Sequence, residues 1–148
     1  MFVKKITYTD EFTGEKVTDP FYFNLTQAEI IDLEATLPGG IAGSLRLTKD
    51  GRDPEVMINF LKTIIGKAYG ERPYNSRKFV KSKENTDAFL ASEAFSELLF
   101  ELLEDENAAN EFFTGVFPDM KKMNSRIEAI RSKGEKQKAL ESPDVVVE

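Results

Sequence analysis

Three glutamates spaced four residues apart form the clearest arrangement of side chains that could do chemistry in this chain. Glu93, Glu97 and Glu101 would share one face of a helix, and two carboxylates can act as acid and base in hydrolysing a glycosidic bond. The same helix would direct its apolar residues the opposite way, which leaves all three carboxylates in water. We therefore interpret them as a solvated helix face, with docking of a basic partner as the alternative and catalysis as the least favoured interpretation.

The two residue types that enzymes use most often for proton transfer and metal binding are missing. The chain has no His and no Cys. This excludes Ser–His and Cys–His nucleophile arrangements and the ordinary zinc, haem and iron–sulfur sites. Residues 50–53 lack the alternating oxygen ligands of a calcium loop, and residues 66–70 lack the Gly-Lys-Ser/Thr order of a phosphate-binding loop. We expect a non-enzymatic binding protein with no catalytic residue, metal or cofactor.

A cluster of phenylalanines is the main alternative to a catalytic site, because it could bind another polypeptide. Phe112, Phe113 and Phe117 are close in sequence, and both core packing and an exposed partner-binding patch stay open for them. A second apolar set follows at three- and four-residue spacing, and would form a short amphipathic helix that binds a partner, docks on its own domain or self-associates. This set is Met120, Met123, Ile127 and Ile130.

Composition narrows the classes of partner. The 148 residues are 41% hydrophobic, with 12 Phe and a net charge of −6. A nucleic-acid binder needs a basic face, so the negative charge argues against nucleic acid. The N-terminus lacks the apolar run of a signal peptide, and no apolar stretch approaches the ~20 residues that span a membrane. We therefore expect a cytoplasmic protein with no nucleic-acid or membrane partner.

Charges of opposite sign are separated along the sequence. Residues 67–83 contain six basic side chains and one acidic one, whereas residues 84–111 contain nine acidic side chains and no basic one. Like charges four residues apart on a helix cost about 0.2–0.5 kcal/mol per pair, which hints at a positive neighbour for the three glutamates. The pattern indicates either ion pairs between the two segments or docking surfaces of opposite sign.

The elements that position these side chains follow from periodicity and capping residues. Alternating β-branched and aromatic residues predict a hairpin with strands at 2–9 and 16–23, in which Pro20 restricts the second strand to an edge or a bulge. Apolar residues at helical spacing predict about five short helices, including one over residues 41–47. Their expected caps are Thr26 with Glu29, Asp53, Ser82 or Thr86, Ser92 and Asp105, and their expected ends are Pro38, Gly70, Gly115 and Pro118.

These elements predict an α+β fold that is mostly α. The hairpin should pack on the compact bundle of helices, because a lone hairpin is marginal in water. Together they should form a domain over residues 1–118. Residues 119–148 should form an amphipathic helix over about 120–131, followed by a flexible charged tail.

Five motifs in order give the chain a family resemblance over residues 2–118. They are FYFNLTQAE at 21–29, KAYG at 67–70, RKFVKS at 77–82, EAFSEL at 93–98 and FFTGVFP at 112–118. With the preceding hairpin, this series resembles the tail assembly chaperones of long-tailed siphophages that infect Gram-positive bacteria. Each motif alone has little specificity, and the resemblance depends on their order and spacing.

The resemblance implies a viral protein that acts in the host cytoplasm during tail assembly and is absent from the mature virion. Such proteins bind the tape measure protein, keep it soluble and promote polymerisation of tail tube subunits around it. The tail tube protein and another copy of the chain are further expected partners. We expect the helices at 93–104 and 106–115, with residues 120–131, to form the binding surface. The alternative is a structural virion component, such as a tail or connector subunit that joins its neighbours through the edge strand.

Overall fold

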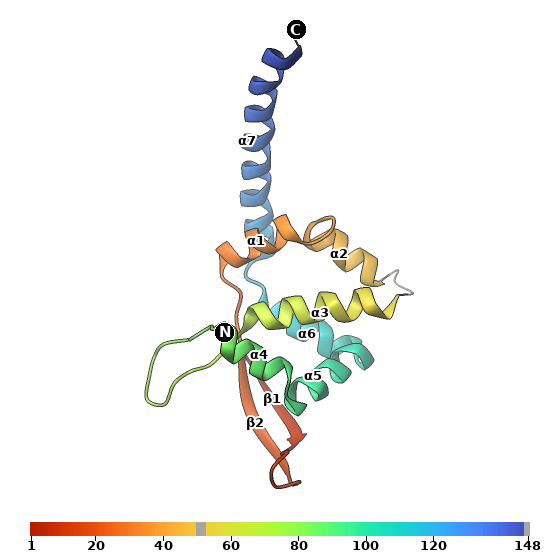
Figure 1. The fold of residues 1–148 in the computed structure, drawn as a ribbon, viewed down its shortest axis with the longest axis vertical. Coiled ribbons are helices and arrows are strands. Elements are labelled where there is room, and N and C mark those ends of the chain that lie inside the picture. Colours follow the sequence, from red (N-terminus) through yellow and green to blue (C-terminus); the bar gives the residue numbers. More distant parts are fainter. Residues whose placement is uncertain (50–52, 147–148) are drawn as a thin grey trace. The chain divides into compact units, whose positions relative to one another are not determined.

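The N-terminal hairpin has the expected strands in the computed structural model, which describes residues 1–49 and 53–146. Strand β1 (Phe2–Thr9) and strand β2 (Lys16–Phe23) form the hairpin (Figure 1). They pair antiparallel, from Phe2 opposite Phe23 to Thr9 opposite Lys16. Side chains of β1 alternate, so that Ile6 is buried while its neighbours on the other face are exposed. One face of the hairpin therefore belongs to the core.

A third strand extends the sheet beyond the predicted hairpin. Strand β3 (Tyr69–Gly70) pairs with Tyr22 and Phe23, which gives the strand order β1-β2-β3. We expected Gly70 to end the preceding helix, whereas that helix ends at Ala68 and the chain becomes extended. The glycine is required for another reason, because a Cβ at position 70 would lie 2.3 Å from the ring of Phe79.

Six helices follow within the described part of the unit Met1–Phe117, and with the hairpin they confirm the α+β, mostly α class. Helix α5 packs against β1, α4 and α6, while α3 packs against α2 and α4. The bounds are α1 (Gln27–Thr36), α2 (Gly40–Lys49), α3 (Pro54–Ala68), α4 (Lys83–Leu90), α5 (Glu93–Glu104) and α6 (Glu106–Val116).

Side-chain caps begin the helices where the sequence predicted them. Thr26 and Glu29 form the full capping box of α1, with Glu29 N–H donating to Thr26 Oγ1 at 3.2 Å and Thr26 N–H donating to Glu29 Oε1 at 2.9 Å. Of the two candidates for α4, Ser82 is the cap. Asp105 both ends α5 and caps α6, accepting from the Asn107 and Ala108 amides. Helices α5 and α6 are therefore joined by a single residue.

Aromatic rings join the sheet to the helices in the core. Phe23, fully buried on β2, lies 5.3 Å from the Phe112 ring and 5.8 Å from the Phe89 ring. Tyr69 stacks on Phe89 at 4.2 Å, and burial, followed by the nearby Glu71 carboxylate, raises the pKa of its hydroxyl. The many phenylalanines therefore serve in large part to build one core.

The second unit, Pro118–Glu148, contains helix α7 (Met120–Val146). This helix continues beyond residue 131, the end of the predicted amphipathic helix. The residues from 135 to 142 are mostly good helix formers, which accounts for the continuation.

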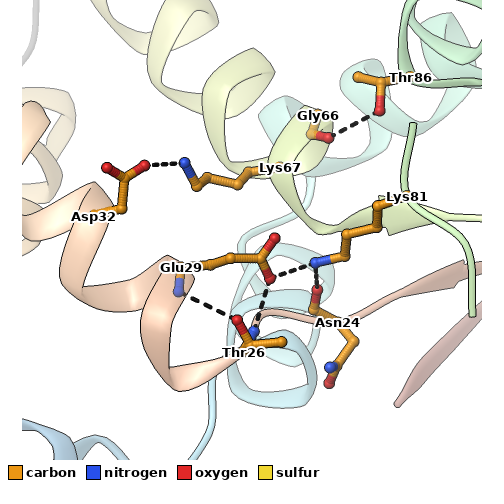
Figure 2. A network of polar contacts seen from close by, with 8 residues as sticks. All are labelled: Asn24, Thr26, Glu29, Asp32, Gly66, Lys67, Lys81 and Thr86. Atoms are coloured by element: carbon orange, nitrogen blue, oxygen red, sulfur yellow. Dashed lines mark hydrogen bonds and ion pairs between the residues drawn. The ribbon is translucent and has the colours of Figure 1, made fainter. Parts of the chain in front are cut away.

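Two lysines from the basic segment 67–83 form ion pairs with α1 (Figure 2). Lys67 pairs with Asp32, and Lys81 Nζ donates to Glu29 Oε1 and to the Asn24 carbonyl oxygen, each at 2.5 Å. One of the two interpretations of the charge pattern, ion pairs between the basic and acidic segments, therefore does not hold for these two lysines. They bind the helix that follows the hairpin instead.

Replacing Glu29 with Gln should reduce the loss of folding stability that occurs as the pH falls. Burial raises the pKa of Glu29, but hydrogen bonds from Lys81 and Thr26 outweigh it, so the pKa lies below its usual 4.5. A lowered folded-state pKa stabilises the fold above pH 4.5, and this contribution is lost as pH falls through the folded-state value. Because Gln keeps the capping box, the variant should differ from wild type in stability at pH 7 and converge with it as the pH falls through the folded-state pKa of Glu29.

Urea unfolding at a series of pH values measures this effect. Glu84→Gln is the matched control, since Glu84 is an exposed carboxylate in the first turn of α4. A Glu29→Gln curve that runs parallel to wild type at every pH would contradict the role given to the ion pair with Lys81.

Candidate partner-binding site

An apolar groove of about 400 Å³ lies among helices α2, α3, α5 and α6. Its floor is made of buried side chains, among them Phe60, Leu61 and Leu102, which are 5–6% exposed. We call this feature the four-helix groove. Its lining residues are Leu45, Met57, Phe60, Leu61, Leu102, Leu103, Glu104, Glu106, Ala109, Asn110, Phe113 and Thr114.

Helical spacing places these side chains on the groove. Met57, Phe60 and Leu61 are three and four residues apart, so α3 presents them on one face. The α6 positions from Glu106 to Thr114 repeat the same spacing. The single-residue connection at Asp105 holds α5 and α6 together at one end of the groove.

The rim of the groove is partly accessible and acidic. Leu103 is 37% exposed, and Met57 and Phe113 are half-buried. Glu104 and Glu106 are exposed beside them, and no basic residue is among the lining residues. The groove therefore combines apolar side chains that a partner can still cover with a negative border.

The three phenylalanines singled out by the sequence lie in different environments. Phe112 is 1% exposed and packs edge-on against Phe2 at 5.4 Å, so we assign it to the core and leave it out of the proposed surface. Phe113 is half-buried, lines the groove and lies 6.1 Å from both the Phe60 and Phe117 rings. Phe117, also half-buried, follows the end of α6. One of the three therefore lines the groove directly.

The three glutamates of α5 are not brought together with a second catalytic group. Glu93 and Glu97 are exposed, while Glu101 is half-buried and pairs with Lys4 Nζ of β1 at 2.7 Å. The positive neighbour that the sequence suggested is therefore a strand lysine. Glu97 and Glu101 border a separate hollow beside β1.

The apolar set after Phe117 lies on α7, in the second unit. Met120, Met123, Ile127 and Ile130 occupy positions three or four residues apart, as expected for one helix stripe. Ile130 is 53% exposed. Whether this stripe contributes to partner binding stays a prediction.

The sequence places α5 and α6 in the expected binding surface, but it assigns α2 and α3, which also line the groove, no part in it. Helical periodicity alone does not distinguish Met57 and Leu103 from the buried apolar residues of the same helices. The signal in the sequence is the breadth of the apolar stripe of α3, which includes Val56 and Met57 beside the buried Phe60 and Leu61. A stripe wider than one packing partner can cover indicates an additional surface.

Metal-binding clusters and membrane-spanning helices can be assessed for the described ranges, 1–49 and 53–146. Within them, no three His, Cys, Asp or Glu side chains converge as metal ligands. No helix there combines the length and apolar character that crossing a bilayer demands. Three of the four residues considered for a calcium loop, 50–52, lie outside the described residues.

A family model described as phage tail assembly chaperone matches residues 1–146. Searches of curated proteins and of solved structures found no match. The match includes the hairpin, the groove and the whole of α7.

Proposed function

Because the chain belongs to the phage tail assembly chaperones, we propose that it keeps the tape measure protein soluble by covering its apolar helical segments in the four-helix groove. Membership of this family makes it a non-catalytic kind of protein that acts during phage assembly in the host cell. Its partners are to be sought among phage tail proteins. Three statements go beyond family membership and are proposals. They are that the partner is the tape measure protein, that the chain promotes tube polymerisation, and that it is absent from the virion.

The observation that carries the proposal is the four-helix groove itself. Its exposed apolar residues cost free energy while they face water, and covering a Leu or Met side chain fully is worth about 1.5–3 kcal/mol. The groove volume of about 400 Å³ falls within the range of sites that receive compact ligands or a few side chains. An amphipathic helix could insert its apolar side chains there while its polar face stays in water.

The charge of the surroundings favours a partner helix with basic flanks. Nine acidic residues and no basic one occur between residues 84 and 111, a range that includes α5 and the part of α6 as far as Glu111. Glu104 and Glu106 lie at the groove rim. Complementary charge of this kind raises association rates and orients the partner more than it raises affinity.

One groove of this size gives only a modest affinity for one helical turn. A tape measure protein is expected to be a long helix with repeated apolar stripes, so many copies of the chain can occupy it in sequence. Weak contacts along one partner accumulate through effective concentration. A reversible cover is also what assembly requires, since the tube must later replace the chaperone.

Co-expression with the tape measure protein of the same phage tests the proposal. The tape measure protein should be insoluble alone and soluble with the wild-type chain, and the two should co-purify. Quantitative protein analysis of purified particles should then show no stoichiometric amount of the chain. A tape measure protein that is equally soluble alone would contradict the proposal, and a stoichiometric virion component would support the structural alternative instead.

A further inference from the structure

The outer edge of β1 is open to another strand. In the order β1-β2-β3, β1 is the terminal strand, and among the described residues it pairs only with β2. An open edge presents unpaired N–H and C=O groups that an extended peptide can bind.

The hairpin register identifies which backbone groups face that edge. Asp10 N–H donates to the Glu15 carbonyl oxygen at 2.8 Å, so this pair is hydrogen-bonded. Hydrogen-bonded and non-hydrogen-bonded pairs alternate, and continuing the alternation along β1 places Lys5, opposite Pro20, in a non-hydrogen-bonded pair. Pro20 has no N–H to give, which agrees with this assignment.

The same alternation directs the amides of Val3, Lys5 and Thr7 away from β2. A short contact supports it, because Thr7 Oγ1 and Thr18 Oγ1 are 2.7 Å apart and side chains are closer in non-hydrogen-bonded pairs. Lys4 and Ile6 direct their amides into the hairpin. The open edge therefore offers three alternate amides in a row.

A hollow of about 400 Å³ lies beside this edge. Four consecutive β1 residues line it. Because consecutive strand residues point to opposite faces of the sheet, the hollow follows the edge of β1 and is not confined to one face. Its opposite wall comes from α5, where Phe100 is 56% exposed. The lining residues are Lys4, Lys5, Ile6, Thr7, Glu97, Phe100, Glu101, Glu104 and Asp105.

The charges in the hollow define the side chains that would fit. Glu101 is neutralised by Lys4, whereas Glu97 and Glu104 take part in no ion pair within the described residues. Seven residues of helix separate these two carboxylates by about 10 Å, with Phe100 between them. Residues i and i+4 of a strand are about 13 Å apart and point to the same face. A basic–x–apolar–x–basic segment therefore matches this wall.

We propose that the β1 edge is a second docking site, which shares Glu104 alone with the four-helix groove among the lining residues and binds an extended partner segment carrying two basic residues around an apolar one. The segment adds a fourth strand to the sheet through the outward groups of Val3, Lys5 and Thr7. Its basic side chains meet Glu97 and Glu104, and its apolar side chain covers Phe100. The site gives the chain one mode of binding for helices and another for extended peptide.

Amide hydrogen exchange on the full chain tests this site, with the blocked peptide Thr-Lys-Thr-Val-Thr-Lys-Thr as the probe. At millimolar peptide, exchange at Val3, Lys5 and Thr7 should slow at least fivefold, while exchange at Lys4 and Ile6 stays unchanged. The peptide with Glu in place of both Lys should have no effect. Absence of slowing at the three amides overturns the proposal. So does concentration-dependent protection without peptide, which would place another copy of the chain there.

Two variants separate this site from the groove. Glu97→Lys with Phe100→Ser should weaken peptide binding at least tenfold, whereas the control Glu93→Lys, on the same helix but outside the hollow, should not. Lys5→Pro removes an outward N–H without removing a hairpin bond and should also abolish binding. Unchanged peptide affinity in the folded double variant overturns the proposal, while tape measure solubility in that variant tests the groove independently.

Discussion

Replacing Leu103 with Glu is expected to abolish solubilisation of the tape measure protein without unfolding the chaperone. Leu103 lines the groove and is 37% exposed in the free chain, so its side chain is available to a partner. The substitution removes an apolar contact and leaves a carboxylate facing apolar side chains, which costs about 2 kcal/mol or more at a central contact. Binding of a tape measure fragment should weaken at least 30-fold by calorimetry, and the co-expressed protein should become insoluble.

Leu47→Glu provides the matched control for this prediction. Leu47 belongs to α2, is 52% exposed and does not line the groove, so the same change in side chain should leave binding within about twofold. The midpoint temperature of thermal unfolding of both variants should stay close to that of wild type, since each side chain is already partly in water. Equal loss of binding in the two variants would show that added negative charge, and not the groove, is responsible.

Replacing Phe112 with Ala is expected to destabilise the fold by about 3–5 kcal/mol, the usual cost of removing a buried phenylalanine. The ring is 1% exposed and lies between Phe2 of β1 and Phe23 of β2, with centroid distances of 5.4 and 5.3 Å. Its loss would detach α6 from the sheet. For a domain of ordinary stability this is a large part of the 5–15 kcal/mol available. Urea unfolding at pH 7 measures the change.

The control for the core prediction is Phe12→Ala, because Phe12 is fully exposed in the hairpin turn. Its unfolding midpoint should stay at the wild-type value. A Phe112→Ala variant that is as stable as wild type but no longer binds the tape measure protein would move Phe112 from the core to the binding surface. That result would favour the other interpretation open from sequence.

Local signals in the sequence were sufficient for most of the fold. Thr26 with Glu29, and the caps Asp53, Ser92 and Asp105, act through hydrogen bonds to residues two or three positions away, so their effect is encoded locally. The hairpin strands followed from alternation for the same reason. Family membership, expected from five ordered motifs, is confirmed over residues 1–146.

The parts that sequence reasoning missed depend on contacts between distant segments. Strand β3 is only two residues long and exists because Tyr69 and Gly70 meet the end of β2. Periodicity marks Leu103 as apolar but does not show that neighbouring helices leave it uncovered. Lys4 and Glu101 are 97 positions apart, so no local sequence pattern predicts their ion pair. The four-helix groove could not be predicted from the sequence, because it depends on how four helices pack against one another.

Methyl NMR of the full chain during titration with tape measure fragments tests the central claim most directly. Met57 and Leu103, which carry methyl groups, line the groove, whereas Met120 and Met123 lie on α7. We predict that the Met57 and Leu103 signals shift in a saturable way and acquire contacts to the fragment. Shifts confined to Met120 and Met123, with Met57 and Leu103 unmoved at saturation, would contradict binding in the groove.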